Sequence, residues 1–185
     1  KPKPEIVRIP FSDEEIQRLW DEIHFPFADM VMIGIYTGFR PQELAILKIE
    51  DVDFENLTIQ GGLKSEAGRN RIVPIHPAIL ELVKKNYDQA QAMHSDHLFN
   101  DEFGQQGTFL TYDKYRGRFN KVMKRMNMNH KPHDARHTFI TKAKAADMNE
   151  YILKLIVGHA VEDITEKTYT HRTIEDLHRE IQKIK

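Results

Sequence analysis

A segment near residue 40 combines residue types that bind a phosphate group. Arg40 lies between Gly38, which suits the end of a helix, and Pro41, which suits the first turn of the next one. The free N–H groups of a helix start and a guanidinium both bind phosphate oxygens. Glu43, on the same helix, is placed to support the guanidinium. Taken alone, the segment is more typical of an exposed loop arginine followed by a surface glutamate.

A second segment, Pro132 to Phe139, places His133, Arg136 and His137 on one face of a predicted helix. The spacing of the two histidines also occurs in zinc-binding helices. However, Asp134 stands where that motif has a glutamate, and Arg136 would put a positive charge beside the metal. The sequence therefore predicts no metal site here, and ordinary helix histidines are the other explanation.

Three single residues complete the set. Lys64 lies in the turn-rich stretch 61–65, from which its ammonium group could donate a proton to a leaving oxygen. His159 follows Gly158 at a predicted helix end, and Tyr169 lies between two threonines. Each residue also has an ordinary explanation. A turn lysine is usually solvated, a histidine is favoured by the dipole at a helix end, and a half-buried tyrosine is common.

Together these groups suit transesterification at a phosphodiester. Two arginines and a histidine supply positive charge where negative charge grows in the transition state. A tyrosine oxygen can attack phosphorus and hold it as an ester. A lysine can protonate the departing 5′ oxygen, and a histidine can take or give the tyrosine proton. This chemistry requires no metal and no cofactor, and the sequence has no glycine-rich phosphate loop ending in Lys-Ser or Lys-Thr.

The elements that must position these residues form an α+β pattern. The sequence predicts a mostly α-helical domain with a small three-stranded antiparallel sheet on one side. A capping box at residues 12–15 marks the first helix start. Further helices are predicted over residues 27–36, 41–47, 77–91, 111–126, 134–146, 149–157 and 172–184, with a short one from residue 163 that would carry Tyr169. Strands are predicted over residues 52–54, 57–59 and 71–75.

Composition sets further limits. The 185 residues suggest one domain, or one domain plus a tail. The lack of cysteine excludes disulfides and thiolate metal sites, as suits a reducing cytoplasm. No stretch reaches the roughly 20 apolar residues that span a bilayer, so no membrane association is expected. The formal net charge of −1 counts against DNA binding when averaged over all faces, but local clusters of charge matter more.

Positive charge is concentrated in two stretches. Residues 112–125 interleave basic and aromatic side chains, and residues 64–71 are basic on a predicted hairpin. Such side chains bind backbone phosphates of nucleic acids. A solvated helix face is the other explanation for the first stretch. The predicted DNA contacts are Arg69, Arg71, Lys114, Arg116, Arg118, Lys121 and Lys124.

The order Arg, Lys, His-x-x-Arg, Gly-His, Tyr resembles the catalytic domain of the tyrosine recombinase, or phage integrase, family, and most of all the integrases of bacterial conjugative transposons. The resemblance extends from about Ser12 to His171. Five motifs in the family's order outweigh the ordinary explanation of each. Two features depart from the pattern: His159 and Tyr169 are one residue further apart than is commonest, and Ser65 follows Lys64 where threonine is frequent. Besides Lys64, the matching segments are residues 37–44, 133–139, 155–159 and 169–171.

The resemblance implies a site-specific DNA recombinase that cleaves and rejoins strands through a 3′-phosphotyrosyl intermediate without a cofactor. It implies that Tyr169 is the nucleophile and that Arg40, Arg136 and His159 contact the scissile phosphate. Lys64 would be the general acid, and His133 would assist proton transfer. Glu43 and His137 would be supporting residues. A type IB topoisomerase-like enzyme and a non-catalytic DNA-binding accessory protein are the alternatives.

The resemblance also implies partners and domain boundaries. Double-stranded DNA would be the substrate, bound by a homo-oligomer in a tetrameric synapse. The protein would be associated with the nucleoid in the bacterial cytoplasm. Residues 1–11, rich in Lys and Pro, are typical of a linker to a preceding DNA-binding domain. Residues 12–171 would form the catalytic domain. The apolar stripe of the last helix, over residues 172–185, would pack on a neighbouring protomer or on its own domain.

Overall fold

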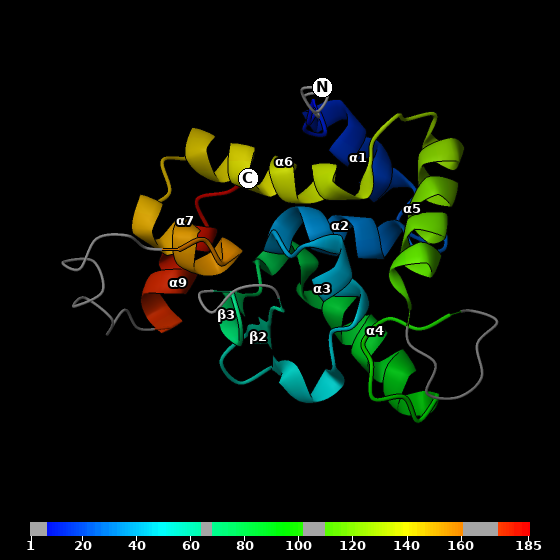
Figure 1. Ribbon diagram of the computed structural model, residues 1–185, viewed down its shortest axis with the longest axis horizontal. Coiled ribbons are helices and arrows are strands. Elements are labelled where there is room, and N and C mark those ends of the chain that lie inside the picture. The colour runs from blue at the N-terminus through cyan, green and yellow to red at the C-terminus, as the bar shows by residue number, and fades with distance from the viewer. Residues whose placement is uncertain (1–6, 64–67, 102–109, 161–173) are drawn as a thin grey trace, which may run out of the picture.

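Helix α2 (Ala28–Thr37) lies at the centre of the fold, and all of its residues are buried. Its sequence is apolar on every side, as a helix enclosed by other elements requires. In this computed structural model, which describes residues 7–63, 68–101, 110–160 and 174–185, helix α6 (Pro132–Ala145) packs along α2 (Figure 1). Helices α1 (Asp13–Asp21), α4 (Leu80–Ala92) and α5 (Tyr112–Met126) also contact α2.

Capping residues fix where the first helices begin and end, and these predictions are confirmed. Ser12 Oγ accepts a hydrogen bond from Glu15 N, and the Glu15 carboxylate accepts one from Ser12 N, which completes the predicted capping box of α1. Gly38 ends α2 with a φ of 68°. A Cβ atom on Gly38 would lie 2.6 Å from Phe139, so a side chain has no room there.

The predicted sheet is present, with slightly different strand ends. Strands β1 (Val52–Asp53), β2 (Thr58–Gly61) and β3 (Arg71–Pro74) pair in this order, all antiparallel. In β2 and β3, Ile59 pairs with Val73, and both side chains are fully buried. The alternation of the two strands therefore puts one face of the sheet against the helices.

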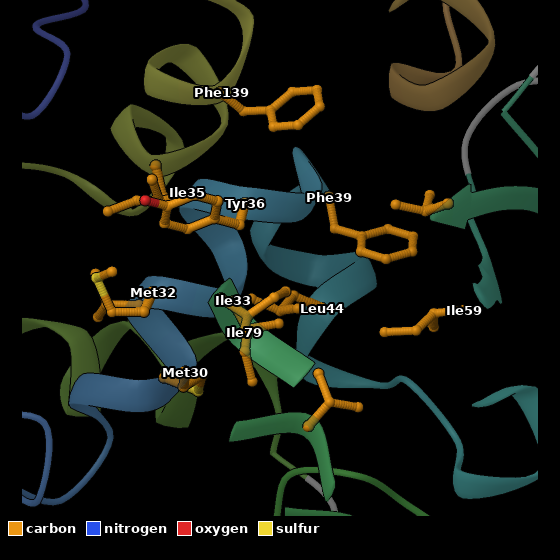
Figure 2. Packing of buried hydrophobic residues seen from close by; sticks show 14 of the residues in the cluster. Met30, Met32, Ile33, Ile35, Tyr36, Phe39, Leu44, Ile59, Ile79 and Phe139 are labelled. Carbon is orange, nitrogen blue, oxygen red and sulfur yellow. The ribbon is translucent and has the colours of Figure 1, made fainter. Parts of the chain in front are cut away.

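The core joins the sheet to the helices. Figure 2 shows Ile33 of α2 near Leu44, and Phe39 between α2 and Ile59 of the sheet. Phe139 extends from α6 toward the same region. The aliphatic and aromatic side chains from these elements form one continuous cluster, so a shift of any one element is transmitted to the others.

Helix α3 (Pro41–Ala45) is shorter than predicted. The sequence predicts a helix through Leu47, but the Leu47 carbonyl accepts a hydrogen bond from Leu98 N, and Lys48 forms a bridge with His97. These contacts with a distant segment draw the chain out of the helix. Two 3-10 turns follow in the chain, η1 (Ile49–Asp51) before the sheet and η2 (Pro77–Ile79) before α4.

The last described elements are helices α7 (Glu150–Val157) and α9 (Ile174–Ile181), both in contact with β3. Leu177, Ile181 and Ile184 of the terminal segment are buried, and the His76 ring donates a hydrogen bond from Nε2 to the Ile184 carbonyl at 2.8 Å. In this single chain the terminal helix thus packs on its own domain. None of the described helices has the length and apolarity needed to cross a membrane.

Candidate active site

Arg136 joins segments that are far apart in the sequence. Its side chain is almost completely buried on α6. Nη1 donates to the Gly38 carbonyl at 2.7 Å, and Nη2 donates to the Val157 carbonyl at 2.8 Å. Gly38 comes just before Arg40, and Val157 comes just before His159. Arg136 therefore fixes the relative positions of the two segments that carry these candidate phosphate ligands.

His159 completes this junction at the exit of α7. Gly158 ends the helix with a φ of 71°, and the chain then places His159 Nε2 at 3.2 Å from Arg136 Nη2. A guanidinium only donates hydrogen bonds, so Nε2 is the acceptor in this contact and the imidazole is neutral. The His159 side chain is exposed, which leaves it accessible to a ligand.

Positive charge is crowded at this point. His159 is exposed but loses part of its hydration, and this partial desolvation, followed by the charges of Arg136 and Arg40, lowers the pKa of its ring. Burial and the charges of Arg40 and Arg71 lower the pKa of Arg136 to about 10, against the opposing effect of Glu43. The cationic side chains repel one another in the absence of an anion, and a bound phosphate would relieve that repulsion. The site is therefore suited to a negatively charged ligand.

Arg40 lies at the start of α3 and is held by Glu43. The Arg40 backbone N–H donates to Glu43 Oε2 at 3.0 Å, and Arg40 Nη1 donates to Oε1 at 2.9 Å. About one fifth of the Arg40 side chain is exposed (20%), so part of the guanidinium can reach a ligand while Glu43 orients it.

Glu43 is a buried carboxylate with four donors. Besides the two groups of Arg40, it accepts from Arg71 Nη2 at 2.6 Å and from Leu63 N at 3.4 Å. Burial raises the pKa of Glu43, but the hydrogen bonds from Arg71 and Arg40 outweigh it and lower the pKa to about 2. The carboxylate is therefore ionised under all ordinary conditions and supports two arginines at once.

The prediction that Arg71 contacts DNA is wrong. Arg71 is 6% exposed, and its guanidinium is used inside the protein. Nε donates to the Ile156 carbonyl at 2.8 Å, Nη1 to the Gly68 carbonyl at 2.9 Å and Nη2 to Glu43. The sequence contained a signal for this burial, because Arg71 and Val73 lie two residues apart on one strand and so point to the same face.

The two remaining histidines of the candidate site lie on α6. His133 is half-buried one turn before Arg136. His137 is also half-buried, and within the described residues no hydrogen bond connects it to Arg40, Arg136 or His159. Its supporting role stays a prediction. In the same described ranges, no three His, Asp or Glu side chains are grouped so that they could hold a metal ion.

Two predicted catalytic residues, Lys64 and Tyr169, lie outside the described residues, as does the predicted short helix from residue 163. The structure does describe residues that flank these two segments. Leu63 and Gly68, on either side of the segment with Lys64, are both hydrogen-bonded to the Glu43–Arg71 pair. His159 precedes the segment with Tyr169.

The predicted DNA contacts on α5 divide into two groups. Arg116, Lys121 and Lys124 are exposed. Arg118 instead pairs with the buried Asp101 at 2.5 Å, and Lys114 pairs with the same carboxylate at 3.2 Å. Helix α5 lies at the opposite side of the molecule from α7 in Figure 1, so it would contact DNA away from the candidate site.

The hairpin contributes one exposed basic residue from the predicted set, Arg69. It precedes the buried Arg71 by two residues, on the side of the molecule where β3 contacts α7. Arg69 and the exposed part of α5 are thus the predicted phosphate contacts that the structure leaves on the surface.

Comparison with known sequences gives a consistent family match. The model of the "Phage integrase family" matches residues 11–175. Tyrosine recombinase XerA from Pyrococcus horikoshii is 30% identical over 159 residues, which cover 84% of this chain and 54% of the relative. The transposase of transposon Tn916 from Enterococcus faecalis is 26% identical over 184 residues, covering 84% and 45%. The chain spans about half the length of the curated relatives it matches.

Solved structures share the fold. The integrase of mycobacterium phage Brujita superposes with a TM-score of 0.75 at 21% identity, covering 100% of this chain and 60% of that one. The Tn1549 transposon integrase, in complex with circular intermediate DNA, gives a TM-score of 0.71 at 22% identity, covering 98% and 67%. The crystal structure of XerA recombinase gives 0.70 at 24% identity, covering 96% and 64%.

Proposed function

This chain belongs to the phage integrase family, and we propose that it is the catalytic domain of a tyrosine recombinase that cleaves and rejoins DNA at specific sites. One observation carries the proposal. Arg136 binds the Gly38 and Val157 carbonyls and contacts His159, so it brings Arg40 and His159 to one place on the surface. The positive charge gathered there matches a phosphodiester.

The proposed roles follow from this arrangement. Arg40, Arg136 and His159 would hold the non-bridging oxygens of the scissile phosphate. The phenolic oxygen of Tyr169 would attack phosphorus, forming a 3′-phosphotyrosyl ester as the bond to the 5′ oxygen breaks. Lys64 would give a proton to that 5′ oxygen, and His133 would assist removal of the tyrosine proton. These last three roles rest on the resemblance of the motifs.

The relatives support recombination over the two alternatives. Their names describe tyrosine recombinases and transposon transposases, and none of those cited above is described as a topoisomerase. The Tn1549 integrase is described in complex with DNA, which supports duplex DNA as the substrate of this chain as well. Such a substrate would place the protein with the chromosome in the cytoplasm.

The assembly is part of the same proposal. We expect a homotetrameric synapse on DNA and a DNA-binding domain attached before residue 12. The chain covers about half of its relatives, which leaves room for such a domain in the whole protein. Docking of the terminal helix on a neighbouring protomer would require α9 to leave β3, which it contacts in this chain.

Trapping of the covalent intermediate tests the proposal. A pool of nicked duplexes with a randomised central sequence is incubated with the full-length protein in chelator, so that a cleaved fragment can diffuse away and leave protein attached to DNA. We expect a covalent adduct on a denaturing gel for the wild type and none for Tyr169→Phe. An adduct that persists in Tyr169→Phe would refute the nucleophile, and relaxation of a plasmid without recombination would indicate a topoisomerase.

A further inference from the structure

The β2–β3 hairpin is fastened to two other elements through the side chain of Arg71. Arg71 is the first residue of β3, and it pairs with Gly61, the last residue of β2, so it stands at the base of the loop over residues 62–70. Its Nη2 reaches Glu43 on α3, and its Nε reaches the Ile156 carbonyl near the end of α7. One side chain thus connects the hairpin to the element that carries Arg40 and to the element that precedes His159.

The Glu43–Arg71 ion pair binds the chain on both sides of the loop. On the β2 side, Leu63 N donates to Glu43 Oε1 at 3.4 Å. On the β3 side, Arg71 Nη1 donates to the Gly68 carbonyl at 2.9 Å. The guanidinium also stacks over the ring of Phe39, 4.9 Å from its centroid. A planar fork is suited to this task because its donors lie on three separate nitrogens, whereas all the donors of a lysine lie on one nitrogen.

Glycines allow the backbones to meet around Arg71. A Cβ atom on Gly62 would lie 1.7 Å from the Gly68 carbonyl oxygen and 2.4 Å from Arg71 Nη1. A Cβ atom on Gly158 would lie 2.8 Å from Gly68 Cα and 3.2 Å from Arg71 Cδ. The backbone of Gly68 therefore packs directly against the turn that leads to His159.

We propose that Arg71 is a positioning residue: with Glu43 and the end of α7 it holds Leu63 and Gly68, the described residues that flank the segment carrying the proposed proton donor. This inference rests on the proposed function, in which Lys64 of that loop protonates the leaving 5′ oxygen. Arg71 does not touch the DNA. Its loss removes the hydrogen bond to the Gly68 carbonyl and one partner of Glu43, whereas the two hydrogen bonds from Arg40 to Glu43 do not involve Arg71.

A change of leaving group distinguishes this role from a merely structural one. The duplex selected in the trapping experiment is prepared with its normal 5′ oxygen or with sulfur at that bridging position. A thiolate leaves without being protonated, because a thiol has a pKa of about 8.5, whereas an alcohol leaving group needs an acid. For each variant, the ratio of the sulfur to the oxygen cleavage rate is measured on the same protein preparation. Misfolded protein lowers both rates equally and leaves the ratio unchanged.

We expect the ratio to rise by roughly 10- to 100-fold in Arg71→Met, because misplacement of a catalytic group by about 1 Å costs on this order. Arg71→Lys should give a smaller rise, and Lys64→Ala should give at least as large a rise as Arg71→Met. Arg18→Lys is the control, since Arg18 also donates to a backbone carbonyl, that of Met126, but from α1. Its ratio should match the wild type.

Other outcomes would overturn the proposal. If Arg71→Met slows both substrates to the same extent, Arg71 supports the fold or the grip on phosphate and does not position the proton donor. If Lys64→Ala leaves the ratio unchanged, the loop has no donor to position. A wild-type protein that forms no adduct with either substrate contradicts the proposed function itself, a result that differs from both of these.

Discussion

At the scale of single residues, the site depends on one negative charge among several positive ones. Glu43 is 2% exposed and accepts hydrogen bonds from Arg40, Arg71 and Leu63 N. Removing one partner of a buried ion pair leaves the other charge uncompensated, which costs more than the pair itself contributes. Glu43 is therefore the residue whose neutralisation should disturb both the stability and the geometry of the site.

We predict that Glu43→Gln lowers the free energy of unfolding by about 3 kcal/mol, the lower part of the range for breaking a buried pair, since the amide keeps one acceptor oxygen. Urea denaturation at pH 7 measures this change. Glu81→Gln is the matched control, because Glu81 pairs with Lys84 on an exposed face of α4 and should change the value by less than about 0.5 kcal/mol.

The pH dependence gives an independent check of this prediction. The pKa of Glu43 is lowered from 4.5 to about 2, so the ionised group stabilises the fold fully above pH 4.5. Its contribution is lost as the pH falls from 4.5 toward 2. The difference in the free energy of unfolding between wild type and Glu43→Gln should therefore become smaller below pH 4.5. If that difference stays constant below pH 4.5, the charge of Glu43 is not the cause of the destabilisation.

At the scale of elements, helix ends decide where the site residues emerge. Gly38 ends α2 in the left-handed region, φ 68°, and places Arg40 at the start of α3. Gly158 does the same for α7 and His159. In both cases a side chain would meet close neighbours, Phe139 at 2.6 Å in the first and Gly68 Cα at 2.8 Å in the second. These glycines fix the two turns from which the phosphate ligands project.

We predict opposite effects for alanine at two glycines. Gly38→Ala should destabilise the protein by roughly 1–3 kcal/mol, because alanine is strained at this φ and its Cβ collides with Phe139. Gly117→Ala should stabilise it by roughly 0.5–1 kcal/mol, because Gly117 lies inside α5 with no atom within 4 Å of an added Cβ. Thermal unfolding of both variants tests the pair. Equal shifts in the same direction would contradict this reading of Gly38.

At the scale of the whole molecule, charge is distributed unevenly despite a formal net charge of −1. Basic side chains are exposed along α5, and cationic groups gather near Arg136. DNA affinity arising from such local patches falls with added salt. Separately from these patches, burial lowers the pKa of three histidines in different parts of the fold.

These histidines predict a loss of stability on mild acidification. Burial lowers the pKa of His76, His97 and His159 below 6.5, so the unfolded chain binds more protons than the folded one. The contribution of these neutral histidines to the free energy of unfolding is fully present above pH 6.5. It is lost as the pH falls from 6.5 toward the lowered pKa of each histidine in the folded state. The free energy of unfolding, measured from pH 7.5 to about pH 5, should fall, by at most about 1.4 kcal/mol per pH unit for each excess proton.

His76 allows a specific control for this prediction. Its Nδ1 accepts from Ala78 N and its Nε2 donates to the Ile184 carbonyl, an arrangement that only the neutral ring can make. His76→Asn removes the titrating ring and keeps an acceptor for the helix start. The variant should lose stability less steeply between pH 6.5 and 5. An unchanged slope would exclude His76 as a source of the effect.

The sequence by itself determined the features that depend on near neighbours in the chain. Ser12 and Glu15 predicted a capping box because the two residues that form it lie three apart. Gly38 predicted a helix end because the left-handed conformation favours glycine. The order of the motifs was also in the sequence, and it predicted the family and the α+β fold. The caps are local signals and the motif order is read along the chain, so neither requires knowledge of the packing.

Only the tertiary structure decided which groups meet. Arg136 reaches two carbonyls that lie 98 and 21 residues away, and no local pattern specifies such partners. Arg71 was predicted to face DNA, yet it lies inside because Glu43 and the end of α7 supply acceptors that compensate its burial. Helix α3 ends before Leu47 because the Leu47 carbonyl accepts a hydrogen bond from Leu98 N, in a distant segment of the chain. Burial and pairing depend on contacts between remote segments, and these exist only after the chain has folded.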